Sequence, residues 1–305
     1  MFLSRVINHW SRVPPKYRWK VVLTTIILLL VVDWFLPPLP TPRILERWPD
    51  AGSGFTPWVP LLAGVDYARA SFNSPRPMKC HVVRIDLGNT NVSLLARPPW
   101  PTGPLETDAE YVSTFVRSQA VQLAINTTPF APDRVLPGRP VNLQGLAVSQ
   151  GRQFSPAEGN LDSLVITRDN RARLVPAGGN TADAWNGAGG FLITLRDGRN
   201  VAERLSPEPA TVIGLSGDGH WMFWLVVDGR QPGYSEGATP SETAEILRNL
   251  GAADAMNMDG GGSSTLACAA VWKGVRVLNR PHHWVWSGLE RPVGASLGVR
   301  SQPLR

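Results

Sequence analysis

Trp221-Met-Phe-Trp-Leu-Val-Val227 decides the fold, because every one of its positions is apolar. A strand covered on both faces explains this pattern, and the run is too short for a membrane-spanning helix. A capping box follows at Thr239-Pro-Ser-Glu242, and Gly251 supplies the stop of the helix. Residues 253–258 return as a short strand. This order allows a crossover in which the return strand runs parallel to the first.

Each of these two strands is followed by an aspartate and a glycine. Asp228-Gly-Arg230 combines a carboxylate, a flexible hinge and a guanidinium that can pair bidentately with phosphate. Asp259-Gly-Gly-Gly-Ser-Ser-Thr265 can turn backbone N–H groups toward an anion, and its hydroxyls add donors. It is no Walker loop, because no GKS or GKT sequence follows. A tight Asp-Gly turn and a plain glycine-rich turn remain the structural alternatives.

Two further motifs near the C-terminus pair charge with proline, namely Asn279-Arg-Pro281 and Glu290-Arg-Pro-Val293. His282 and His283 lie between them and lack other ligands at metal spacing, so we expect a rim or structural role and no metal site. The adjacent tryptophans 284 and 286 could stack on a sugar or belong to the core.

The rest of the chain shows short strand patterns separated by turn residues. Residues 81–87 and 92–96 alternate around the turn Gly88-Asn89 and predict an early hairpin. Thr107-Asp-Ala-Glu110 matches a capping box and predicts a helix to about residue 120. Further strands are expected at 121–125, 163–166, 190–194 and 211–215. The class is therefore α+β, a single domain with a mixed β-sheet and a few helices.

Composition supports this class. An apolar fraction of 43% in 305 residues can build a substantial core, and 29 glycines with 28 prolines indicate many turns. The net charge of +6 is scattered beyond the first twenty residues, so no nucleic-acid footprint is present. Cys80 and Cys268 could form a disulfide or act as two buried apolar residues.

The N-terminal segment predicts a single membrane anchor. Residues 21–36 are apolar apart from Asp33, and five basic residues precede them with no acidic one. This order predicts a cytoplasmic tail (1–20), a transmembrane anchor in the cell membrane (21–36), a proline-rich linker (37–63) and a periplasmic or extracellular domain (64–305). A cleaved signal peptide is the alternative, but Pro37-Pro-Leu-Pro-Thr-Pro42 offers no small-x-small cleavage site.

The combined motifs resemble the phosphodiester glycosidase family. The resemblance rests on residues 226–237, the helix that ends near residue 251, residues 257–266 and the two C-terminal motifs, and it spans roughly residues 64–300. This is the catalytic domain type of the lysosomal uncovering enzyme, which removes N-acetylglucosamine from a phosphodiester on mannose. The resemblance implies hydrolysis of a sugar-1-phosphodiester at the anomeric C–O bond, here in an envelope glycan or exopolysaccharide.

The resemblance also implies residue roles. Catalysis is assigned to Asp228 or Asp259, with Glu290 as a reserve acid or base. We expect substrate binding by eleven residues: Asn126, Arg230, Gly260, Gly261, Gly262, Ser263, Ser264, Thr265, Asn279, Arg280 and Arg291. No cofactor is predicted, although a divalent cation beside the aspartates is compatible with the sequence.

Two positions depart from the family pattern. Thr127 stands where the family has glycine, and Ala210 stands where it has arginine. These changes favour a second hypothesis, a non-catalytic glycan-binding or polysaccharide-export module. A third hypothesis is a glycosyl transferase that uses a sugar hydroxyl in place of water. The catalytic hypothesis requires that Asp228, Asp259, Arg230 and Glu290 converge on one cleft.

Overall fold

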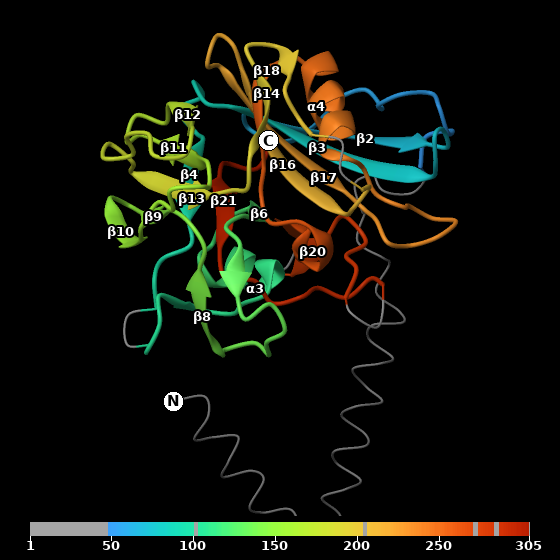
Figure 1. Cartoon of the computed structure of the whole chain (residues 1–305). Helices are drawn as coiled ribbons and strands as arrows, with labels where there is room; N and C mark the ends of the chain where they lie inside the picture. Colours follow the sequence, from blue (N-terminus) through green and yellow to red (C-terminus); the bar gives the residue numbers. More distant parts are fainter. Residues whose placement is uncertain (1–47, 101–102, 204–205, 271–273, 284–286, 305) are drawn as a thin grey trace, which may run out of the picture. The chain divides into compact units, whose positions relative to one another are not determined.

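The computed structural model describes residues 48–100, 103–203, 206–270, 274–283 and 287–304 (Figure 1). The expected cytoplasmic tail, the anchor at 21–36 and the two tryptophans 284 and 286 lie outside these residues. No helix in the described part of the chain is long and apolar enough to cross a membrane.

An eight-stranded antiparallel sheet forms the larger part of the domain. Its strands, in spatial order, are β1 (Val59–Leu62), β2 (Val65–Phe72), β3 (Met78–Asp86), β17 (Trp221–Val227), β16 (Ala210–Ser216), β18 (Ala252–Asn257), β14 (Ile193–Arg196) and β15 (Arg199–Asn200). The apolar run that decides the fold is therefore a central strand, with both alternating sets of its side chains buried beyond Trp221.

Helix α4 (Pro240–Asn249) covers one face of this sheet and contributes Ala244 and Leu247 to its core. The predicted capping box is confirmed, because the Thr239 side chain accepts from the Glu242 N–H and the Glu242 side chain accepts from the Thr239 N–H. The crossover takes a form that the sequence did not specify. Strands β17 and β18 run in the same direction, but β16 lies between them and pairs antiparallel with both.

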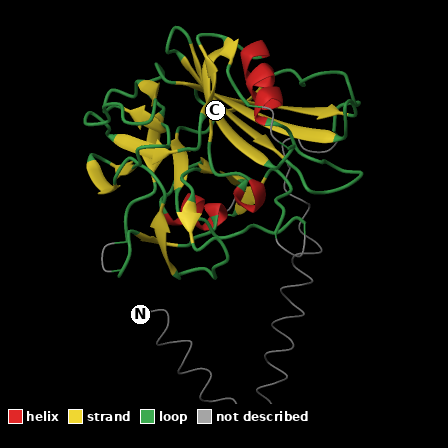
Figure 2. Ribbon diagram, in the orientation of Figure 1, coloured by secondary structure: helices red, strands yellow, loops and turns green. Residues whose placement is uncertain are grey.

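Three smaller antiparallel sheets complete the domain (Figure 2). The first has the order β20 (Val275–Val277), β19 (Leu266–Ala269), β6 (Leu123–Asn126), β21 (Ser296–Arg300) and β4 (Ser93–Ala96), and helix α3 (Val112–Ser118) packs against it. The second has the order β10 (Arg152–Ser155), β9 (Ala147–Ser149), β13 (Asn186–Gly189), β11 (Ser163–Ile166) and β12 (Ala172–Val175). The third is β5 (Thr107–Asp108), β8 (Pro140–Leu143) and β7 (Phe130–Ala131).

The expected α+β class, one sheet-rich domain with few helices, is confirmed. The expected mixed sheet is not found, because every strand pair in the described residues is antiparallel. Three local predictions are also wrong. Strands β3 and β4 belong to different sheets, since β3 forms its hairpin with β2. Thr107 lies in β5, where its hydroxyl accepts from Arg97 (2.9 Å), so it does not cap α3. The folded unit begins before residue 64, because β1 pairs with β2 and the partly buried Phe55 packs on the core.

Candidate active site

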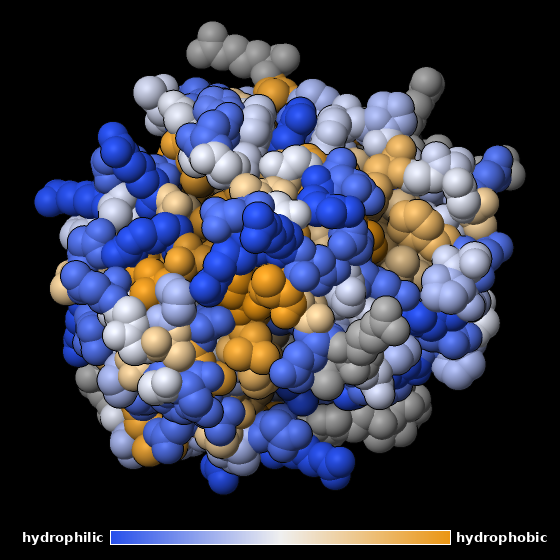
Figure 3. All heavy atoms as spheres, turned by 45° about the horizontal axis from the view of Figure 1, so that its top comes forward, coloured by the Kyte–Doolittle hydropathy of each residue, from blue (hydrophilic) through white to orange (hydrophobic). Residues whose placement is uncertain are grey.

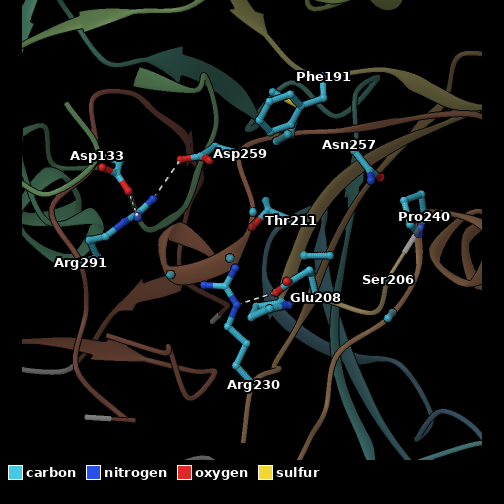
Figure 4. Close-up of a pocket in the computed structure, with 17 residues that line it drawn as sticks. Asp133, Phe191, Ser206, Glu208, Thr211, Arg230, Pro240, Asn257, Asp259 and Arg291 are labelled. Atoms are coloured by element: carbon cyan, nitrogen blue, oxygen red, sulfur yellow. Dashed lines mark hydrogen bonds and ion pairs between the residues drawn. The ribbon is translucent and has the colours of Figure 1, made fainter. Parts of the chain in front are cut away.

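A pocket of about 520 Å³ lies where β16 begins and β18 ends (Figure 4). Residues 209–211 form one part of the pocket lining. Residues 257–262, which include the glycine-rich loop, form another part. Arg230 and Arg291 enter from two separate loops. The antiparallel pairing of β16 with β18 therefore brings the two predicted motifs to one edge of the sheet.

The three glycines of the loop are needed for close packing. A Cβ on Gly260 would lie 2.9 Å from the Pro209 carbonyl oxygen, and one on Gly262 would lie 2.8 Å from that of His282. Gly261 has φ +58° and donates its N–H to the Pro209 carbonyl (2.8 Å). The Gly261 amide is therefore engaged within the protein, and the expectation that it holds a phosphate is not supported.

Of the three predicted catalytic carboxylates, Asp259 is the one that lines the pocket. Its backbone is fixed on both sides, because its N–H donates to Thr127 (2.8 Å) and its carbonyl accepts from the Asn126 side chain (2.6 Å). Burial raises the pKa of Asp259 from 3.8 to about 6, against the opposing effects of the Ser263 hydroxyl and the Arg291 guanidinium. Such a carboxylate changes protonation near neutral pH, as many catalytic acids and bases do.

Two guanidinium groups border this carboxylate. Arg291, with 10% of its side chain exposed, lies 3.6 Å from Asp259 and 3.9 Å from Asp133 and donates to the Ser263 hydroxyl. Arg230 pairs with Glu208 at 2.5 Å, and its guanidinium lies over Gly261. Figure 4 shows the two arginines pointing into the pocket from separate elements. Planar guanidinium groups suit the bidentate binding of a phosphodiester.

Asn126 lies behind the pocket and positions it. The side chain is fully buried and donates to the Asp259 carbonyl. Its oxygen accepts from the Thr211 hydroxyl (2.7 Å) and from the Thr265 N–H (3.1 Å). Asn126 therefore joins β16, β6 and the glycine-rich loop, and it does not reach the substrate space.

Asp228 is buried below the pocket and does not line it. Its carboxylate accepts from the Asn279 amide (3.0 Å), the Arg280 N–H (2.9 Å) and the Tyr234 hydroxyl (3.1 Å). Asn279 in turn donates to the Ser264 carbonyl (2.9 Å), which links this cluster to the glycine-rich loop. A carboxylate enclosed in this way supports the loop, so a catalytic role for Asp228 is not supported.

Glu290 also lies outside the pocket lining. Its carboxylate accepts from the N–H (3.0 Å) and the hydroxyl of Ser113, in the first turn of α3. It thereby supplies the N-terminal cap that the sequence assigned to Thr107. Burial raises the pKa of Glu290.

Six of the predicted site residues line the pocket: Arg230, Gly260, Gly261, Gly262, Asp259 and Arg291. The other eight do not: Asn126, Asp228, Ser263, Ser264, Thr265, Asn279, Arg280 and Glu290. The convergence expected of Asp228, Asp259, Arg230 and Glu290 is thus met by two of the four. Asp259, Arg230 and Arg291 are the charged residues among those predicted that line the pocket.

The sequence interpretation missed two carboxylates at the pocket, Glu208 and Asp133. Glu208 directly precedes the family-like stretch at residues 209–214, so its position was the available signal. Asp133 carries no comparable signal. In the described part of the chain, no three His, Cys, Asp or Glu side chains gather as metal ligands, and Cys80 and Cys268 are both unpaired.

Comparison with known proteins identifies the family of the chain. The profile of the phosphodiester glycosidase family matches residues 119–300. The chain belongs to this family. The matched segment contains Asn126, Arg230, the glycine-rich loop and Arg291, and it therefore includes the whole of the predicted site. A search of curated proteins gives no match.

Three solved structures share the fold at 17% identity. One is the zebrafish N-acetylglucosamine-1-phosphodiester α-N-acetylglucosaminidase catalytic domain auto-inhibited by its pro-peptide, with TM-score 0.56 over 80% of this chain and 85% of that one. A putative exported protein of Burkholderia pseudomallei gives 0.52 over 73% and 74%. A hypothetical protein from Synechocystis gives 0.51 over 78% of this chain, which spans 62% of that protein.

The two departures from the family pattern have different structural consequences. Thr127 contacts Asp259 through its backbone carbonyl, a contact that any residue can make. Ala210 lines the pocket wall, where an arginine would add a third guanidinium. The site of this family member therefore relies on Arg230 and Arg291.

Proposed function

We propose that this protein hydrolyses sugar-1-phosphodiesters at the anomeric C–O bond. The observation that carries the proposal is the buried Asp259 carboxylate, with a pKa raised to about 6, beside Arg291 in a pocket that Arg230 also enters. A carboxylate can act on an anomeric centre, and guanidinium groups can hold the phosphate attached to it. Membership of the phosphodiester glycosidase family supports this reaction class.

Each group then has one task. Arg230 and Arg291 bind the phosphodiester and stabilise the negative charge that stays on its oxygens. Ionised Asp259 faces the anomeric carbon and stabilises the positive charge that develops there. The bond from C1 to the phosphate oxygen breaks, the electron pair leaves with the phosphate, and water supplies the new C1 hydroxyl and releases its second proton to the departing phosphate or to solvent. A phosphate monoester is a good leaving group, so the reaction needs little acid assistance.

The proposal can be tested with methyl esters of hexose and N-acetylhexosamine 1-phosphates in ¹⁸O-labelled water. We expect free sugar labelled at C1 and unlabelled methyl phosphate. Sugar 1-phosphate with methanol would mean cleavage at phosphorus and would contradict the proposal. A glycoside formed with an added sugar acceptor would instead indicate glycosyl transfer.

Ala210 favours a second candidate function, a glycan-binding or polysaccharide-export module without hydrolysis. The missing arginine leaves the pocket with less positive charge than the family pattern provides. Saturable binding of a sugar-1-phosphodiester with no turnover, abolished in Arg291→Ala, would support this alternative. Labelled product from the ¹⁸O experiment would exclude it.

We further propose that the domain acts outside the cytoplasm, held at the cell membrane by residues 21–36. The apolar run and the basic residues ahead of it support this location. Protease added to intact spheroplasts should degrade the domain, and alkaline carbonate should leave the chain in the membrane fraction. Protection from the protease, or release by carbonate, would contradict the location.

A further inference from the structure

A second hollow, of about 560 Å³, adjoins the candidate active site. It shares Phe191, Pro240 and Asn257 with the pocket around Asp259. The rest of its wall is largely aliphatic and includes Leu161, Leu192, Ile193 and Val201. We call this hollow the apolar groove. Figure 3, which brings the β14 and β18 end of Figure 1 forward, shows apolar surface exposed among hydrophilic side chains.

The groove exposes large apolar side chains in one place. Phe191, Leu192 and Val201 are 42%, 50% and 53% exposed. They are three of the seven large hydrophobic residues that are exposed in the described part of the chain. Single exposed apolar residues need no explanation, but a cluster beside a polar pocket marks a binding surface.

The backbone at this cluster is held in place. The Phe191 N–H donates to the Asn257 carbonyl (2.7 Å), and the Asn257 N–H donates to the Leu192 carbonyl (3.1 Å). The Ile193 N–H donates to the Asp162 carboxylate (2.6 Å). Asn257 ends β18 two residues before Asp259, so the groove and the catalytic carboxylate share one rigid support. A preformed surface loses little entropy when a ligand binds.

The charge of the two hollows differs. Glu203 is the one charged group among the described residues that line the apolar groove, whereas the neighbouring pocket is lined by Arg230 and Arg291 together with the carboxylates of Asp133, Glu208 and Asp259. A ligand that fills both is therefore expected to have a polar, charged end, which the two arginines can bind, and an apolar end. The shared wall at Phe191 and Asn257 allows one molecule to extend from one hollow into the next.

We propose that the apolar groove binds the aglycone of the substrate, and that this aglycone is a hydrocarbon chain esterified to the sugar phosphate. The inference rests on the proposed function and specifies its substrate class. The sugar phosphate occupies the pocket that contains Arg230 and Arg291. The hydrocarbon chain of the aglycone is removed from water where it packs on Leu192 and Val201. Each methylene that leaves water contributes roughly a fourfold gain in affinity.

The test compares methyl, octyl and phenyl esters of one sugar 1-phosphate on the full-length protein, without free detergent. We expect kcat/KM to be at least about tenfold higher for the octyl than for the methyl ester. Leu192→Ser and Val201→Ser should each reduce this ratio severalfold. Leu304→Ser, at the same 50% exposure outside the groove, is the matched control and should keep the ratio.

Equal kcat/KM for the methyl and octyl esters, or a ratio that Leu192→Ser leaves intact, would overturn the proposal. A preference for the phenyl over the octyl ester would also overturn it, since the groove would then select a flat ring. If no ester is hydrolysed, the proposed function fails. Titration calorimetry then tests separately whether the groove binds the octyl ester. Tighter binding of the octyl ester that Leu192→Ser removes would support the groove even then.

Discussion

Two Asp-Gly turns follow strands β17 and β18 of the same sheet, yet their carboxylates have opposite surroundings. Asp228 is 1% exposed and accepts hydrogen bonds from Asn279, Arg280 and Tyr234. Asp259 opens onto the pocket, and its nearest cation, Arg291, is 3.6 Å away. The first carboxylate is saturated by donors within the protein, and the second has capacity left for a ligand.

The difference shows how one local motif can serve two purposes. An aspartate at a strand end is held rigidly in both cases. The Asp228 carboxylate accepts from the Arg280 N–H and the Asn279 amide, whereas the Asp259 carboxylate interacts with Gly260 and Ser263 of its own loop and still lines the pocket. The buried turn supports the active one, because Asn279 also binds the Ser264 carbonyl.

The largest expected effect is on activity. Asp259→Asn should lower kcat/KM by roughly 10³-fold while the protein stays folded, because the ionised carboxylate is lost. In the wild type, kcat/KM should rise with pH through about 6, the value to which burial raises the pKa of Asp259. Steady-state kinetics on a sugar-1-phosphodiester measures both. Asp254→Asn, on the strand that precedes Asp259, is the control. An equal loss of kcat/KM in this variant would contradict a specific catalytic role for Asp259.

The next effect is on stability and concerns the buried turn. Asp228→Ala removes the acceptor of the Arg280 N–H and the Tyr234 hydroxyl, and one of the two acceptors of the Asn279 amide. We expect the free energy of unfolding to fall by about 3 kcal/mol or more. Urea denaturation measures it, and Asp183→Ala, which breaks a surface pair with Arg173, should change it by less than about 1 kcal/mol. A similar small change in both variants would show that the enclosure of Asp228 has little energetic weight.

A third effect is the pH dependence of stability that the Asp259 carboxylate causes. The folded-state pKa of Asp259 is raised from 3.8 to about 6, so the folded protein binds this proton more tightly than the unfolded chain. The resulting stability is present below pH 4 and is lost as pH rises through 6, by at most about 3 kcal/mol. Urea unfolding at pH 4.5 and pH 7 should show a loss in the wild type that is smaller in Asp259→Asn. Parallel profiles in the two proteins would contradict the raised pKa.

The smallest effect concerns the third acidic residue of the sequence hypothesis. Glu290→Ala removes the carboxylate that caps α3 through Ser113. We expect a loss of about 1 kcal/mol in the free energy of unfolding and an unchanged kcat/KM. Thermal or urea unfolding together with kinetics measures both. A fall in kcat/KM as large as that of Asp259→Asn would return Glu290 to the catalytic residues.

Part of the site could be predicted because its signals are local. The apolar run of β17, the capping box at Thr239 and the glycines at 260–262 each identify an element or a turn from neighbouring residues. The early hairpin and the helix cap at Thr107 failed for the opposite reason. Strand β3 pairs with β2 and β17, and Thr107 pairs with Val141, and neither choice is visible in the adjacent sequence.

The sequence by itself determined the central strand at 221–227, the helix capped at Thr239, the glycine-rich loop, the pair of Asp-Gly turns and the resemblance to the phosphodiester glycosidase family. These depend on periodicity, capping and backbone freedom, which act over a few residues. Only the tertiary structure decided that Asp259 faces the pocket, that Asp228 is enclosed and that Glu290 caps a helix. Exposure and hydrogen-bond partners depend on segments far away in the chain, such as Ser113 and Glu290, which are 177 residues apart.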